Sequence, residues 1–424
     1  MTISRIKFGA FLAPHHPVGE SPTHLLQRDL DLVTHLDRLG FDEFWCGEHH
    51  SSGWEMIASP ELFLAAAGER TKRIRLGTGV VSLPYHHPFN VAQRIVQLDH
   101  MTGGRVIFGT GPGALPSDAK MFGIDQLLLR DRQDEALGVI VRLLSGERFT
   151  VKSDWFEIND GMLQLLPVQE KLPMAAASSI SPSGMQLAGK YGMGALSIAS
   201  TSSEGLDALP LQWSFAEEAA QKHGKTVDRR DWRVLVSFHL AESKEQARKE
   251  ALDGLWWWHN EYNVRVLGRP GSVRVEDKWA LMDQVAGGAG VVGSSVVGTP
   301  DELVASIRRL QEITGGFGVV LGFAHDWAQP EASRRSWELF ARYVMPEVNG
   351  TTRNQRASAD YLATHNVALM KDRTASIMAK VKGNEKAEAA AAAMASRKAN
   401  TASFSFRPGE GNITARETDK DSDA

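Results

Sequence analysis

FDEFWCGEHH, residues 41–50, is the stretch that decides how this chain folds. A short apolar run with three aromatic residues ends at Cys46, and Glu48, His49 and His50 follow almost at once. The pattern predicts a buried strand that delivers a carboxylate and two imidazoles to one edge of a sheet. Because histidine titrates near neutral pH, this edge suits proton transfer. The same residues also fit a hydrogen-bonded structural loop, and the stretch alone leaves both interpretations open.

Apolar runs alternate with helical patterns on both sides of this stretch. The predicted strands cover residues 6–12, 41–46, 74–81, 106–109, 173–177, 194–198, 232–240 and 317–323. Helical patterns cover residues 23–39, 60–70, 89–101, 130–144, 183–191, 209–223 and 330–344. Ser59 and Ser243 are expected to cap the helices that follow them. Strands that are each followed by a helix imply parallel pairing with right-handed crossovers, so we predict an α/β fold, a closed (β/α)8 TIM barrel.

Two segments interrupt this repeat. Residues 255–298, first rich in tryptophan and then in glycine, form an insertion between the seventh and eighth strands. At the end of the chain, an alanine-rich helix former is followed by a polar segment after residue 400. We therefore expect a barrel over residues 1–350 and a C-terminal extension over residues 351–424 that is helical and then disordered.

The bulk composition excludes several classes of protein. The 424 residues are 42% hydrophobic and 23% charged, as in ordinary globular proteins, and the net charge of -4 gives no reason to expect nucleic acid or an anionic membrane as partner. The single cysteine, Cys46, rules out an internal disulfide and fits a reducing cytoplasm. We expect neither a signal peptide nor a membrane span, because no apolar run approaches roughly 20 residues. A cytoplasmic protein is the expectation.

Two loops have the composition of ligand-binding loops. GTGPGA, residues 109–114, resembles a dinucleotide fingerprint only weakly, because Pro112 removes an N–H that a phosphate would need. It is either a tight loop that lets a planar cofactor approach the backbone or a structural turn. ASSISPSG, residues 177–184, either binds phosphate at a helix N-terminus or only caps that helix through Ser181 or Ser183.

Aromatic residues and histidine pairs give further candidates. Trp256, Trp257 and Trp258 either wall an apolar pocket near the barrel mouth or belong to the core or a subunit interface. Histidine pairs do not by themselves make a metal site, and we predict none. The chain lacks GxSxG, HExxH, GxxxxGK[ST] and CxxC, so the corresponding enzyme classes have no support.

Taken together, these motifs resemble the bacterial luciferase-like flavin-dependent monooxygenases, and within them the limonene-monooxygenase-like branch. The resemblance rests on FDEFWCGEHH (41–50), IRLGTGVVSLPYHHP (74–88) and MTGGRVIFGTGPG (101–113), with further matches over residues 177–184, 296–310, 318–328 and 338–346.

The resemblance implies a (β/α)8 barrel that binds reduced FMN delivered by a separate reductase. We also expect a homo-oligomer, a dimer. In this family O2 adds to the flavin, and the resulting C4a-hydroperoxide oxygenates an organic substrate. A small apolar substrate, a terpenoid or a cyclic ketone, is expected here. Two alternatives remain: a deazaflavin-dependent oxidoreductase of the same fold and a non-catalytic flavin-binding protein.

The resemblance also implies roles for individual residues. His49 corresponds to the active-site histidine, which transfers a proton to the peroxyflavin or stabilises it. For Glu48 and His50 we expect no more than a role in supporting or orienting His49. A non-prolyl cis peptide is expected at Thr78-Gly79. Luciferase itself has an arginine near Gly111 that this chain lacks, which weakens the assignment of the phosphate contacts. The residues expected to contact the cofactor are Thr78, Gly79, Val80, Thr110 and Gly111 at the flavin ring and Ser178 and Ser179 at its phosphate.

Overall fold

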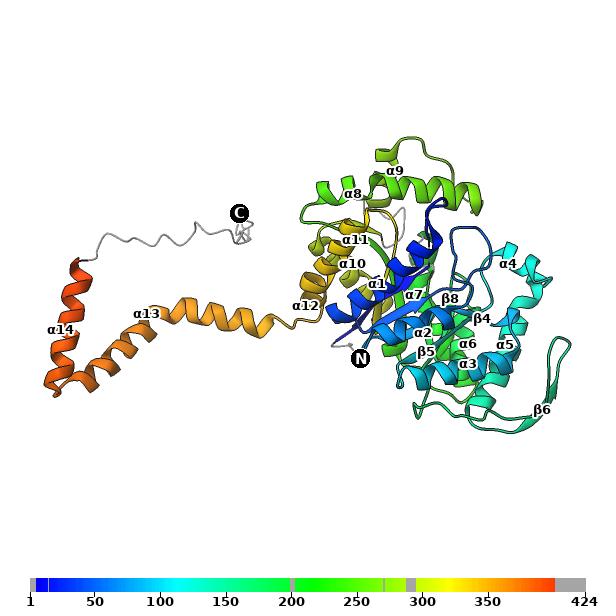
Figure 1. The fold of residues 1–424 in the computed structure, drawn as a ribbon, viewed down its shortest axis with the longest axis horizontal. Helices are drawn as coiled ribbons and strands as arrows, with labels where there is room; N and C mark the ends of the chain where they lie inside the picture. Colours follow the sequence, from blue (N-terminus) through cyan, green and yellow to red (C-terminus); the bar gives the residue numbers. More distant parts are fainter. Residues whose placement is uncertain (1–4, 14, 199–202, 270, 287–294, 401–424) are drawn as a thin grey trace. The chain divides into compact units, whose positions relative to one another are not determined.

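Eight parallel strands close into a barrel in the computed structural model, which describes residues 5–13, 15–198, 203–269, 271–286 and 295–400 (Figure 1). The first strand pairs with both the second and the last, so the closed barrel has no free edge. The (β/α)8 fold expected from the sequence is confirmed. The barrel strands are β1 (Lys7–Leu12), β2 (Glu43–Cys46), β3 (Arg75–Thr78), β5 (Val106–Gly111), β8 (Met174–Ser178), β9 (Gly194–Ser197), β10 (Trp232–Leu240) and β12 (Val319–Phe323).

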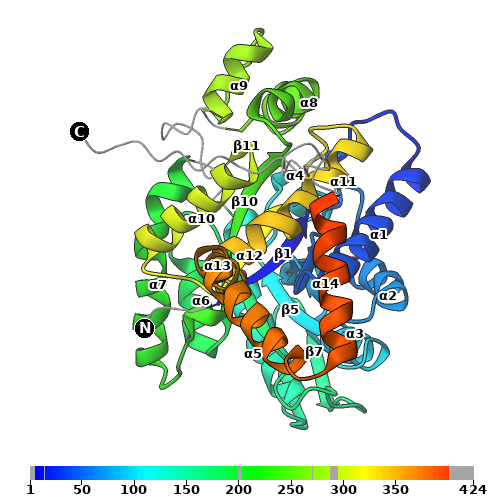
Figure 2. The same cartoon turned by 90° about the vertical axis from the view of Figure 1, so that its left-hand side faces the viewer.

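Helices follow the strands and cover the outside of the barrel (Figure 2). Ser243 accepts a hydrogen bond from the Gln246 N–H and caps its helix as predicted, whereas the Ser59 hydroxyl donates to the Glu61 carboxylate instead. The principal helices are α1 (Pro22–Leu39), α2 (Pro60–Arg70), α3 (Pro88–Met101), α5 (Leu129–Leu144), α6 (Ser183–Tyr191), α7 (Ser203–Lys222), α8 (Lys244–Trp257), α10 (Pro300–Thr314) and α11 (Pro330–Leu339).

Shorter elements decorate the loops between these strands and helices. Two of them follow barrel strands: β4 (Val81–Ser82) and α4 (Pro116–Met121). The predicted insertion contains, after α8, the π-helix Trp258–Val266, α9 (Lys278–Ala286) and β11 (Val296–Gly298). The predicted hairpin is present as β6 (Phe149–Lys152) and β7 (Glu157–Gly161). The π-helix Phe340–Val344 and α12 (Met345–Val348) follow α11.

Side chains alternate along each strand between the barrel interior and the helices. Phe11, Trp45, Leu235 and Leu321 are among the residues of one buried cluster inside the barrel. A Cβ at Gly77 would lie 2.4 Å from the Trp45 ring, so glycine at this position makes room for that indole. Residues at the alternate positions, such as Phe8, Phe44 and Val320, belong to the larger core between strands and helices. This alternation decides which strand residues reach a ligand in the barrel mouth.

A buried ion pair lies among the interior residues, towards the N-terminal ends of the strands. Arg233 donates to both carboxylate oxygens of Glu43, with Nε 2.7 Å from Oε2 and Nη2 3.0 Å from Oε1. The Trp45 indole donates to the same carboxylate at 2.9 Å. This pair joins β2 to β10 across the barrel interior, below the mouth.

The chain divides into two units, residues 1–351 and residues 352–424. The second unit contains α13 (Arg353–Val381) and α14 (Glu385–Asn400), and α13 has no buried residue. The segment after residue 400, for which we expect disorder, lies outside the described residues. Among the helices in the described part of the chain, none combines the length and the apolar character needed to cross a bilayer.

Candidate active site

His49 lies at the mouth of the barrel, directly after β2. Its backbone N–H donates to the Ile57 carbonyl at 3.0 Å, which fixes the loop. Its side chain is 16% exposed and lies between two carboxylates: Nε2 is 3.0 Å from Glu55 Oε2, and Nδ1 is 3.0 Å from Asp118 Oδ2. Both ring nitrogens therefore face acceptors.

These two carboxylates set the charge of His49. Burial lowers the pKa of the imidazole, but the charges and hydrogen bonds of Glu55 and Asp118 outweigh it and raise that pKa to about 10. At neutral pH, His49 is consequently an imidazolium that donates from both nitrogens. Such a group can deliver a proton or stabilise a developing negative charge, but it cannot act as a general base.

Glu55 is the buried centre of this cluster. Besides His49, it faces His15 Nε2 at 3.4 Å and accepts a hydrogen bond from the Tyr262 hydroxyl of the insertion. Burial raises the pKa of Glu55, but the neighbouring histidines, His49 above all, lower it below its ordinary range, so the carboxylate is ionised. Glu55 could not be identified from the sequence, because it lies in an irregular loop and its tyrosine partner is 207 positions away.

Asp118 was also missed by the sequence analysis. It lies on α4, a short helix after β5 that has no recognisable motif. In addition to His49, its carboxylate accepts the His50 N–H at 3.2 Å and the Ser51 hydroxyl. Burial raises the pKa of Asp118. The hydrogen bonds with His49, Ser51 and the His50 N–H, together with the charge of His49, outweigh burial and bring that pKa below its ordinary value. The loop after β2 is thus held in place by α4.

Glu48 and His50 form a separate hydrogen-bonded group beside His49. Glu48 Oε1 is 2.8 Å from both His50 Nε2 and His86 Nε2, and Glu48 Oε2 accepts the Ser82 N–H at 2.9 Å. Burial raises the pKa of Glu48, but these bonds outweigh it and bring it to about 2. The three side chains have the ligand types of a metal site. However, their mutual hydrogen bonds satisfy Glu48 and join the loops after β2 and β4 without an ion.

Several residues predicted to contact the flavin ring lie on opposite sides of the barrel wall. The Thr78 hydroxyl is 2.8 Å from both the N and O atoms of Gly109, and Thr110 Oγ1 accepts from Gln133 of α5 at 3.4 Å. Both threonine side chains are buried and tie the wall together. Gly111 alternates with Thr110 and packs against Val80, where an added Cβ would lie 2.4 Å from Val80 Cγ2.

The cis peptide is one residue later than expected, at Gly79-Val80 instead of Thr78-Gly79. The reason is that β3 keeps its regular pairing with β2 as far as Thr78, opposite Cys46. The Gly79 N–H then still donates to the Cys46 carbonyl at 2.6 Å. The strand direction therefore changes only after Gly79.

The predicted phosphate loop follows β8. Ser178 is buried and donates to Gln212 at 3.4 Å, whereas Ser179 is exposed. Pro182, rather than either neighbouring serine, occupies the N-cap position of α6. Arg130, from the start of α5, donates from Nε to Ser183 Oγ at 3.2 Å, and a cavity of about 160 Å³ adjoins it. Arg130 thus places a guanidinium beside the predicted phosphate loop.

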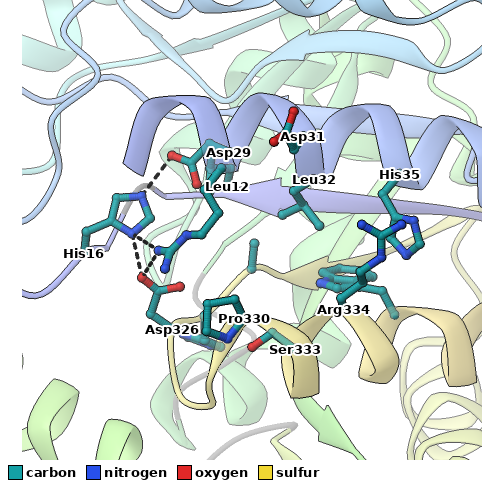
Figure 3. Close-up of a pocket in the computed structure, with 14 residues that line it drawn as sticks. Leu12, His16, Asp29, Asp31, Leu32, His35, Asp326, Pro330, Ser333 and Arg334 are labelled. Carbon is teal, nitrogen blue, oxygen red and sulfur yellow. Dashed lines mark hydrogen bonds and ion pairs between the residues drawn. The ribbon is translucent and has the colours of Figure 1, made fainter. Parts of the chain in front are cut away.

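A second cavity, of about 220 Å³, lies outside the barrel between α1 and α11 (Figure 3). At its edge, His16 is 2.9 Å from Asp29 and 2.6 Å from Asp326, and Arg28 also pairs with Asp326. Burial lowers the pKa of His16, but the two aspartates raise it to about 9. This network joins the loop after β1 to the loop after β12, next to His15 and His325.

Comparison with known proteins agrees with this fold. Residues 6–315 match the family model described as luciferase-like monooxygenase. The chain belongs to this family. It is 50% identical over 365 residues to 4-hydroxyprotoasukamycin monooxygenase of Streptomyces nodosus subsp. asukaensis, which covers 85% of this chain and 97% of that protein. It is 49% identical over 346 residues to limonene 1,2-monooxygenase of Rhodococcus erythropolis, which covers 82% of this chain and 87% of that protein.

Among solved structures, the oxygenating constituent of 3,6-diketocamphane monooxygenase from Pseudomonas putida, a type II Baeyer–Villiger monooxygenase in complex with FMN, has the same architecture. Its TM-score is 0.69 at 27% identity, covering 81% of this chain and 99% of that chain. As a luciferase-like monooxygenase, this protein is an oxygenase that acts on a small molecule with O2, and its FMN-bound relative supports a flavin cofactor.

Proposed function

We propose that this protein is a two-component monooxygenase that uses reduced FMN, supplied by a separate reductase, to oxygenate a small apolar substrate of the terpenoid or cyclic-ketone class. The observation that carries the proposal is the His49 imidazolium held between Glu55 and Asp118 at the mouth of a luciferase-like barrel. The names of relatives that act on limonene and on diketocamphane support the substrate class. The reductase, a homodimeric assembly and a cytoplasmic location stay predictions.

The residues present at the mouth fit a flavin mononucleotide. Arg130 and the Ser183 hydroxyl supply a cation and a donor beside the N-terminus of α6, whose free N–H groups favour an anion. Val80, which packs over Gly111 and is only partly buried, offers apolar surface to a planar ring. When bound, reduced FMN supplies the electrons that activate O2.

The protein's own residues supply a positive charge, a proton and apolar surface that excludes water. His49 holds a proton at each ring nitrogen, and Glu55 and Asp118 keep it charged and fix its orientation. The rings of Phe11 and Phe323, 5.6 Å apart, present apolar surface beneath the mouth. Excluding water there strengthens the electrostatic effect of the imidazolium on any negative charge that forms nearby.

Rapid mixing tests the proposed function. The protein with reduced FMN is mixed anaerobically and then exposed to O2 while the absorption spectrum is followed. We expect a transient flavin spectrum that differs from those of both reduced and oxidised FMN, and free reduced FMN is the control. One-step oxidation of the bound FMN at the rate of free flavin would contradict the proposal. Oxidation of a reduced deazaflavin by substrate would favour the alternative, a deazaflavin-dependent oxidoreductase of the same fold.

Replacing Arg130 with methionine is expected to weaken binding of reduced FMN by roughly 10- to 100-fold, the usual effect of losing a charged hydrogen bond. Equilibrium titration measures the dissociation constant. Arg132→Met is the matched control, because Arg132 lies on the same helix but pairs with Asp154 at 3.9 Å. Riboflavin, which lacks the phosphate, should bind wild type and Arg130→Met equally. An equal loss for riboflavin would mean that Arg130 does not bind the phosphate.

A further inference from the structure

His15 and His325 follow β1 and β12, which are neighbouring strands, and both lie among aromatic rings. His325 also lines the cavity between α1 and α11, whereas His15 does not. The Phe323, His325 and Trp327 rings form a stack, with centroids 4.2 Å and 3.9 Å apart. His15 lies nearly parallel to Phe323 at 5.4 Å and contacts Tyr262 at 4.5 Å. The arrangement is an apolar wall that contains two imidazoles.

Each imidazole uses only one of its nitrogens. His15 Nε2 faces Glu55 at 3.4 Å, and His325 Nε2 lies 2.8 Å from the Ser237 hydroxyl. The Nδ1 atoms of both rings are buried and have no hydrogen-bond partner among the residues that the structure describes. A buried polar atom without a partner costs free energy, so two of them side by side in an apolar wall require an explanation.

The protonation of His15 follows from its partner. An ionised carboxylate can only accept hydrogen bonds, so His15 Nε2 carries the proton that Glu55 accepts. Burial lowers the pKa of both imidazoles, which are therefore neutral. The buried His15 Nδ1 consequently carries no proton and has a free lone pair. The group that satisfies this lone pair must be a hydrogen-bond donor.

We propose that a hydroxyl group of the substrate donates this hydrogen bond to His15 Nδ1, so that the preferred substrate is an apolar ring that carries a hydroxyl. The inference rests on the proposed function, because it assumes that the mouth binds the substrate. Phe323, which is only partly buried, offers apolar ring surface to the hydrocarbon part, and the lone pair selects the hydroxyl. Apolar pockets with a few placed polar groups are the usual form of small-molecule sites.

Equilibrium binding of two matched probes tests the proposal. Limonene and carveol share a carbon skeleton, and carveol adds one hydroxyl. We expect wild type to bind carveol at least about tenfold more tightly, because a site built for a hydroxyl discriminates against a ligand that lacks it. Equal affinities, or failure to bind either compound, would overturn the proposal.

Two substitutions distinguish the donor role of His15 Nε2 from the acceptor role of His15 Nδ1. Gln places its amide near the Nε2 position, so His15→Gln keeps a donor for Glu55 and loses the lone pair. Its preference for carveol should fall to about twofold or less, with limonene affinity within about threefold of wild type. Asn places its amide near Nδ1, so His15→Asn should keep much of the preference. A carveol preference that survives in His15→Gln would contradict the assignment.

His35→Gln is the matched control. His35 also has a buried nitrogen without a hydrogen-bond partner among the described residues, but it lines the cavity outside the barrel (Figure 3). Its substitution should leave the carveol preference unchanged. Rapid mixing of each variant with reduced FMN and O2, without substrate, reports separately on the proposed function. A normal oxygen reaction with no hydroxyl preference would overturn this inference alone.

Discussion

His49→Ala is expected to lower the yield of oxygenated product by roughly 10²-fold or more, the usual scale of a lost acid–base group. The substitution removes the imidazolium between Glu55 and Asp118, and with it both a proton donor and a positive charge at the mouth. Product formed per O2 consumed measures the effect, because uncoupled turnover still consumes O2. Unchanged product yield would remove His49 from the mechanism.

The pH dependence of the same reaction tests the charge of His49. Because its pKa is raised to about 10, the imidazolium persists across neutral pH and is lost only as the pH rises through that value. Wild-type activity that depends on His49 should therefore decline only at alkaline pH. Glu55→Gln removes the largest influence that raises this pKa, so the decline should begin at lower pH. An unshifted profile in Glu55→Gln would contradict the assigned charge.

His50→Gln is the control for loop integrity. His50 lies next to His49, but its ring bonds to Glu48. This variant should keep the alkaline limb of the wild-type profile. If the activity of His50→Gln also began to decline at lower pH, the shift seen in Glu55→Gln would reflect a general loosening of the loop and not the lost charge of Glu55.

Much of this architecture could be predicted from the sequence. The barrel followed from the alternation of apolar runs and helical patterns, and the position of His49 followed from its place after a strand, because parallel strands all end at one face. Its partners could not be predicted. Glu55 lies in an irregular loop and Asp118 on one short helix, and neither has a periodic pattern or a fixed spacing from His49.

The side on which the threonines lie was predictable in principle. Trp45 faces the barrel interior, and its strand neighbour Gly77 leaves space for the indole, so Thr78 must face the other way. The same alternation separates Thr110 from Gly111. The family resemblance assigned neighbouring residues such as Thr110 and Gly111 to the flavin together. In a strand, however, neighbouring side chains point to opposite faces.

The interior ion pair gives the second large expected effect, on stability. Arg233→Met should lower the free energy of unfolding by about 3–5 kcal/mol, because it leaves the Glu43 carboxylate buried without its cation. Glu43 is 0% exposed and Arg233 3%, and the Trp45 indole supplies only one remaining hydrogen bond. Urea unfolding measures the loss, provided that fluorescence and circular dichroism report the same transition.

The double variant Glu43→Leu/Arg233→Met is the matched control. Replacing both partners with apolar residues removes the unpaired charge, so its stability should return to within about 1–2 kcal/mol of wild type or exceed it. Burial raises the pKa of Glu43, but Arg233 lowers it below the ordinary value of 4.5. The pair therefore stabilises the fold above about that pH and loses this contribution as the carboxylate protonates in acid. The double variant should lack this acid-dependent component, and equal destabilisation of single and double variants would show that packing, not charge, explains the loss.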